Sequence, residues 1–179
     1  VITPDSRIQL SYKIHGTSGI SAYVLCKQPL NWKQKLAKWL TGEEFNKYDY
    51  IYASRTVIKN KYYNRNVGGG FYGVDVWAEA DKIVRPCLSR GMSAYYEIVG
   101  YLPNGGCIQK KYDYGCVPPK EGEPYTPEKH FKVRIYRVTY TNIDGKVFEF
   151  TPHQVQQWCA QVGLIPVEEC YCGMAKDLY

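Results

Sequence analysis

A lysine near the start of the chain stands in a setting that suits covalent chemistry. Lys13 ends an alternating segment, residues 7–12, and is followed by a break containing one glycine and two small hydroxyl residues, Ile14-His15-Gly16-Thr17-Ser18. A lysine held rigidly at the end of a strand can face a ligand. The chemistry that suits it is attack on the α-phosphate of a nucleotide, which leaves the activated nucleotide bound to the lysine.

Such a lysine must lose its proton before it attacks. Lowering a lysine pKa from ~10.4 to ~7 takes roughly 4–5 kcal/mol, at about 1.36 kcal/mol per unit. Neighbouring cations, a metal ion or burial can supply that free energy. The alternative interpretation of the same residues is a surface lysine before a turn.

A second candidate is an arginine that follows a strand. Residues 48–59 are rich in tyrosine and β-branched side chains, which favours a strand that delivers Ser54-Arg55-Thr56 beside the first strands. An arginine makes forked hydrogen bonds to phosphate oxygens, so Arg55 suits a triphosphate site. An ordinary surface arginine is the alternative.

A third candidate is a glutamate among apolar neighbours. Residues 93–101 predict a strand in which Tyr95, Glu97 and Val99 share one face. Burial of a carboxylate is costly unless it is paired, so Glu97 suits a ribose hydroxyl or a metal-bound water. In the alternative interpretation the strand lies at an edge and Glu97 faces solvent.

The elements that must position these residues are mainly strands. Residues 20–25 predict a strand antiparallel to residues 7–12, which would place Lys13 at the rim of a sheet. Residues 108–114 predict the return strand of a hairpin after the turn at residues 102–106. The apolar positions are odd-numbered from 131 to 135 and even-numbered from 136 to 140. This change of phase predicts a β-bulge that re-aims Tyr136.

Three helices are predicted around these strands. Asn31 caps the first, whose apolar residues should pack while its lysines form a solvated basic face: Trp32, Leu36, Trp39 and Leu40. The second runs from about residue 73 to 88. The third begins with Thr151 as its cap and ends at Gly163.

Composition limits the class of protein. A chain of 179 residues suits one domain, and its net charge of +6 suits a polyanionic partner. The 18 tyrosines fit base stacking, although half-buried strands are the better explanation for most of them. Seven cysteines without a leader segment predict reduced thiols in the cytoplasm, and their spacing predicts no metal site. No apolar run is long enough to span a membrane.

Four stretches, in order, resemble the ATP-dependent RNA ligases. The run from Lys13 to Ser18 is similar to nucleotidyl motif I, although DNA ligases and capping enzymes usually carry aspartate where His15 stands. Residues 53–56 resemble motif Ia, residues 96–100 resemble motif III, and residues 135–138 resemble motif IIIa, apart from the usual acidic residue after the aromatic. The resemblance implies an α+β fold with mostly antiparallel sheets and flanking helices, the ATP-grasp-like nucleotidyltransferase domain of nucleic-acid ligases.

The resemblance also implies the members of the site. Lys13 would be the catalytic nucleophile, and the nucleotide would contact Tyr12, Lys13, Gly16, Arg55, Glu97 and Tyr136. ATP and Mg²⁺ would be the cofactors, and the partners would be RNA ends, a 5′-phosphate and a 3′-hydroxyl, as in RNA repair. A module that retains the fold but only binds nucleic acid or assembles a complex is the alternative.

Two family motifs are missing from the 179 residues. Motif IV, a Glu-Gly-x-Val strand, and motif V, a Lys-x-Lys strand, have no match, since Glu121-Gly122 lies among prolines and comes too early. We therefore expect one incomplete adenylyltransferase domain that is inactive alone. Gly68-Gly69-Gly70 lacks a following Gly-Lys-Ser/Thr, so we interpret it as a flexible lead into a helix and not as a phosphate loop.

Overall fold

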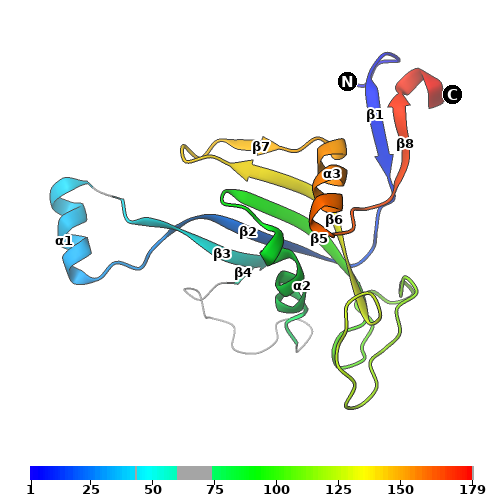
Figure 1. The fold of residues 1–179 in the computed structure, drawn as a ribbon, viewed down its shortest axis with the longest axis horizontal. Coiled ribbons are helices and arrows are strands. Elements are labelled where there is room, and N and C mark those ends of the chain that lie inside the picture. Colours follow the sequence, from blue (N-terminus) through cyan, green and yellow to red (C-terminus); the bar gives the residue numbers. More distant parts are fainter. Residues whose placement is uncertain (43, 60–73, 179) are drawn as a thin grey trace.

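A computed structural model describes residues 1–42, 44–59 and 74–178 (Figure 1). Its strands are β1 (Arg7–Ser11), β2 (Thr17–Lys27), β3 (Asn46–Ser54), β4 (Ile58–Lys59), β5 (Met92–Gly100), β6 (Phe131–Thr141), β7 (Val147–Glu149) and β8 (Glu169–Met174). Its helices are α1 (Trp32–Thr41), α2 (Val76–Val84), α3 (Pro152–Val162) and the short 3₁₀ turns η2 (Arg85–Cys87) and η3 (Ala175–Leu178). The predicted α+β class with mostly antiparallel sheets is confirmed.

The strands form one large sheet and one small one. The large sheet has the order β4-β3-β2-β5-β6-β7, and every neighbouring pair is antiparallel. The small sheet contains only β1 and β8 and projects beside it (Figure 1). The described chain therefore carries its first strand outside the main sheet.

The predicted partner of the first strand is wrong. We expected β2 to pair with β1 across the connection at residues 16–19, but β1 pairs with β8, and β2 lies between β3 and β5. Ser21 and Ala22 in the middle of β2 are buried, which suits a strand with a neighbour on each side. A short strand such as β1 can form stable pairing with a single neighbouring strand. No local turn signal identifies which strand that is.

The predicted bulge is confirmed. The pairing of β5 with β6 shifts register between Tyr95, which lies opposite Arg137, and Tyr96, which lies opposite Ile135. Tyr136 is therefore the extra residue on β6. Ile135 and Val138 are fully buried on either side of it, while Tyr136 is exposed. The bulge thus turns this tyrosine away from the core.

The core lies on one face of the large sheet, under α2 and α3. It joins residues of α2 and α3 to the alternate residues of β5 and β6 that face them, among which Tyr96, Ile98 and Ile135 are completely buried. α3 begins and ends as predicted: Thr151 accepts a hydrogen bond from the Gln154 N–H, and Gly163 closes the helix with a φ of 75°. These helices leave the other face of the sheet free for a site.

Two other expectations need correction. Residues 108–114 form turns and bends instead of the predicted return strand of a hairpin. The strand that pairs with β5 on this side is β6. Next to the turn, Cys107 makes an isolated bridge to Tyr101. α2 is shorter than predicted, since Pro86 lies in the 3₁₀ turn that follows it. The predicted lead into this helix, Gly68–Gly70, lies outside the described residues.

The predicted packing of α1 is also wrong. Its start is as expected, because the Asn31 side chain accepts from the Gln34 N–H and the Gln34 side chain accepts from the Asn31 N–H. Yet none of its residues is buried, and Trp32 and Trp39 are 71% and 79% exposed. α1 connects β2 to β3 at the tip of a long arm, away from the body of the fold (Figure 1). The periodicity of a helix shows that it has an apolar face but does not show what covers it.

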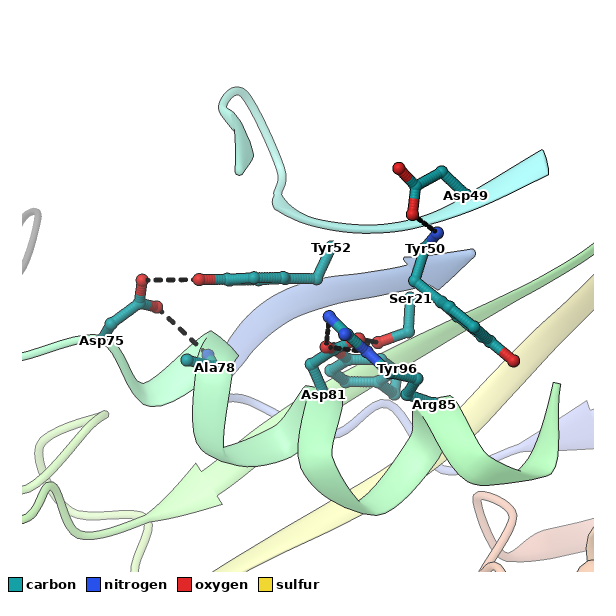
Figure 2. A network of polar contacts seen from close by, with 9 residues as sticks. All are labelled: Ser21, Asp49, Tyr50, Tyr52, Asp75, Ala78, Asp81, Arg85 and Tyr96. Carbon is teal, nitrogen blue, oxygen red and sulfur yellow. Dashed lines mark hydrogen bonds and ion pairs between the residues drawn. The ribbon is translucent and has the colours of Figure 1, made fainter. Parts of the chain in front are cut away.

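A buried polar network ties α2 to the sheet (Figure 2). The Ser21 hydroxyl donates to the Asp81 carboxylate at 2.7 Å and lies 2.9 Å from the Tyr96 hydroxyl. Arg85 donates from Nε to the same carboxylate at 2.8 Å. Ser21, Asp81 and Tyr96 are all buried, and burial raises the pKa of Tyr96. Each of these polar atoms is satisfied only because the others are present.

We expect Asp81→Ala to lower the free energy of unfolding by about 2–3 kcal/mol, because it removes the acceptor of two hydrogen bonds in a buried site. Chemical denaturation measures the change. Glu79→Ala is the matched control on the same helix: its carboxylate pairs with the exposed Lys82, so its removal should change stability by about 0.5 kcal/mol or less. Equal losses in both variants would contradict a special role for Asp81.

Candidate functional site

A cavity of about 770 Å³ opens on the face of the sheet opposite α2 and α3. All six predicted site residues line it: Tyr12, Lys13, Gly16, Arg55, Glu97 and Tyr136. They come from segments that are up to 124 positions apart in the sequence, so local sequence patterns alone do not bring them together. The cavity has the size of those that hold small-molecule ligands.

The six predicted residues that line the cavity come from four parts of the fold. Lys13 and Gly16 lie in the connection from β1 to β2, and Arg55 lies in the turn that follows β3. Glu97 projects from the middle of β5, and Tyr136 projects from the bulge of β6. Because β2 lies between β3 and β5, the three strands bring these side chains to one end of the sheet.

Glu97 is the half-buried carboxylate of this cavity. Its Oε1 accepts a hydrogen bond from the Gly16 N–H at 3.0 Å. Burial raises the pKa of Glu97 above its ordinary value, while the Gly16 hydrogen bond and the nearby His15 and Lys13 act in the opposite direction. The alternative of an edge strand with Glu97 in solvent is wrong, since β5 lies between β2 and β6.

Gly16 permits a close approach of two backbones. A Cβ atom at this position would lie 2.2 Å from the carbonyl oxygen of Ile98 and 2.7 Å from a methyl group of Val99. No L side chain fits at such distances without displacing β5. The glycine of the motif is therefore needed to hold the connection against Glu97.

We expect Gly16→Ala to disrupt the cavity while leaving the core largely intact. The added methyl group must push the connection away from β5, which breaks the contact between the residue 16 amide and Glu97. Nucleotide binding, measured by calorimetry, should fall at least tenfold. Gly106→Ala is a control, because a Cβ there meets side chains and no backbone: the Asn104 side chain at a close 3.2 Å, which can shift, and the Leu102 side chain at 3.5 Å.

Tyr136 is held by residues that the sequence did not identify. Its hydroxyl lies 3.1 Å from the Ser18 hydroxyl, and the Trp77 indole donates to the Ser18 carbonyl at 2.9 Å. Trp77 belongs to α2, so the helix on the core side fixes a residue of the cavity. Ser18 stands inside the motif, but nothing in its spacing pointed to Tyr136.

A second group of residues supports the connection that carries Lys13. The His15 N–H donates to the Tyr114 hydroxyl at 2.7 Å, and the rings of His15 and Tyr112 lie 5.0 Å apart. Lys13 and Tyr114 also line a neighbouring cavity of about 450 Å³ together with Lys132. The run from Ile108 to Tyr114 predicts a strand, and a strand pattern does not indicate that Tyr114 contacts His15.

The charges of the cavity suit an anionic ligand. Lys13 and Arg55 are exposed cations at its wall, and Glu97 is its one carboxylate among the described lining residues. Groups of three or more potential metal-ligating side chains do not occur in the part of the chain that the structure describes. A Mg²⁺ ion commonly takes one or two carboxylates together with substrate phosphates, and Glu97 fits the first part of that requirement.

All seven cysteines are free thiols, and two of them, Cys116 and Cys159, are buried. Burial raises the pKa of Cys159 to about 12. Among the described residues, no helix is both long and apolar enough to cross a membrane.

Comparison with known proteins adds no family to this description. No model of a protein family matches the chain, and no curated protein matches it either.

Proposed function

We propose that this protein is an ATP-dependent RNA ligase that first transfers AMP to Lys13. The observation that carries the proposal is the convergence of six residues, chosen from four separate motifs, on one cavity. Ordinary surface residues from four separate stretches of the chain would have no reason to meet. The size of the cavity and its two cations support a nucleotide as the ligand.

The residues divide the work as follows. Arg55 binds phosphate oxygens of ATP, Tyr136 stacks on adenine, and Glu97 receives the ribose or holds a metal-bound water through its carboxylate. The neutral Lys13 amine donates its lone pair to the α-phosphorus. As that N–P bond forms, the bond to the bridging oxygen breaks, pyrophosphate leaves with the electron pair, and the amine releases a proton to solvent.

The later steps return the lysine. A 5′-phosphate oxygen of RNA attacks the α-phosphorus and displaces Lys13, which gives an AMP-capped RNA end. A 3′-hydroxyl of RNA then attacks the 5′-phosphorus, AMP leaves, and a phosphodiester bond remains. Mg²⁺, where bound beside Glu97, would neutralise phosphate charge.

The test is covalent labelling of the protein. Residues 1–179 and the complete product of the gene are each incubated with Mg²⁺ and ATP labelled at the α-phosphate, and the label is followed on denaturing gels. We expect acid-labile label on the complete product and less on residues 1–179. Label from γ-labelled ATP, or none from either nucleotide, would contradict the proposal.

A further inference from the structure

α1 is a well-formed helix with an unpartnered apolar face. Its caps are complete at both ends, since Gly42 donates from its N–H to the Lys38 carbonyl with a φ of 69°. Its four large apolar side chains are nonetheless exposed: Trp32, Leu36, Trp39 and Leu40. A solvent-exposed cluster of this kind marks a contact surface.

The lysines of α1 frame this face. At 3.6 residues per turn the four apolar side chains fall within an arc of about 100°, with Lys33 at one border and Lys35 at the other. Lys33 Nζ lies 5.6 Å from the centre of the Trp32 ring. The helix contains no acidic residue. A partner must therefore offer flat apolar groups between negative charges.

We propose that α1 binds single-stranded RNA that extends from the cavity, with bases stacked on Trp32 and Trp39 and phosphates beside Lys33 and Lys35. This inference rests on the proposed function. Base stacking on aromatic side chains beside a basic surface is how proteins hold single strands without reading their sequence.

The geometry of α1 favours RNA over two other partners. A second copy of the chain would pack a helix with three lysines and no acidic residue against an identical helix, and these like charges would repel. Binding of a helix to a membrane surface scales with the apolar area it buries, and α1, with 10 residues and a length of about 15 Å, offers only four large apolar side chains. A single strand of RNA can bind to a surface as small as α1, because its bases stack on aromatic rings and its phosphates contact nearby cations.

The position of α1 fixes the length of RNA that can reach it. The cavity is lined by Ser18, near the start of β2, and α1 follows Lys27 at the other end of that strand. Nine residues of strand at about 3.3 Å each separate the two points by about 30 Å. A stacked strand covers that distance with about nine nucleotides at ~3.4 Å per nucleotide. An RNA of five nucleotides should end before α1.

The experiment measures the affinity of the full chain for two 5′-phosphorylated RNAs, a 5-mer and a 16-mer, by fluorescence anisotropy. We expect Trp32→Ala/Trp39→Ala to weaken 16-mer binding about 30-fold and 5-mer binding less than threefold. Trp32→Phe/Trp39→Phe should restore most of the affinity. The control is Ile143→Ala/Val147→Ala, which removes two exposed apolar side chains from the β6–β7 hairpin and should change neither RNA.

Three results would overturn the inference: unchanged 16-mer binding, equal weakening for both lengths, or binding to vesicles of anionic lipid that the tryptophan variant loses while RNA binding stays. Circular dichroism confirms that each variant remains folded. The proposed function is tested separately, because label from ATP on Lys13 should be the same with and without the α1 substitutions. Absence of label in the wild type, with length-dependent RNA binding retained, would overturn the ligase proposal but not this one.

Discussion

Lys13→Ala and Lys13→Arg should both abolish covalent labelling by ATP, with a loss of at least 10⁴-fold from the wild-type rate. Alanine removes the nucleophile. Arginine keeps the positive charge at the wall of the cavity but stays protonated at every working pH, so it cannot attack phosphorus. The measurement is the rate at which α-labelled AMP appears on the protein.

The arginine variant separates chemistry from binding. Because a guanidinium still attracts phosphate, Lys13→Arg should bind ATP within a few-fold of the wild type while it forms no adduct. Lys146→Arg, on the loop between β6 and β7, is the control and should be labelled normally. Undiminished label on Lys13→Arg would place the nucleophile elsewhere.

For Glu97→Ala we expect a folded protein whose rate of AMP transfer falls by about 10²–10³-fold. The substitution removes the acceptor of the Gly16 N–H and the one carboxylate among the described residues that line the cavity. Loss of one preorganised polar contact in a water-poor site typically costs roughly 3–4 kcal/mol in the transition state. Thermal unfolding and single-turnover transfer are measured on the same sample, and normal transfer by a protein of much lower stability would make Glu97 structural.

The pH dependence of transfer reports the state of Glu97. Burial raises the pKa of this carboxyl, so it takes up a proton at a higher pH than an ordinary glutamate does. Since the charged carboxylate is the stronger acceptor and the form that would hold a metal-bound water, transfer should decline on the acid side as pH falls through that raised pKa. The raised pKa of Glu97 affects the stability of the fold in the opposite direction to transfer. Because the native state favours the protonated form, this group contributes stability at low pH that is lost as pH rises. Glu97→Gln should flatten the acid limb.

Local pattern was enough to predict the bulge and the helix caps but not to assemble the sheet. The change of apolar phase at Tyr136 can be read from neighbouring residues of one strand, so the bulge was predictable. The caps of α3 were predictable for the same reason. The pairing of β1 with β8 joins the two ends of the sequence and depends on a partner strand that residues 7–12 do not specify. The exposure of Trp32 was unpredictable because an apolar stripe is the same whether it meets a core or a ligand.

The small sheet also has a kinetic consequence. The register that pairs Arg7 with Met174 closes a loop of more than 160 residues, and the Tyr12 N–H donates to the Glu168 carbonyl at 3.0 Å, directly beside Lys13. Closing a loop of that length costs roughly 4–5 kcal/mol of chain entropy, so this contact should form late, after the large sheet has brought the ends together. During synthesis Lys13 is made long before residue 168, so it gains its neighbour on this side only when residue 168 has left the ribosome. The growing chain would thus carry Lys13, the proposed nucleophile, before this contact positions it.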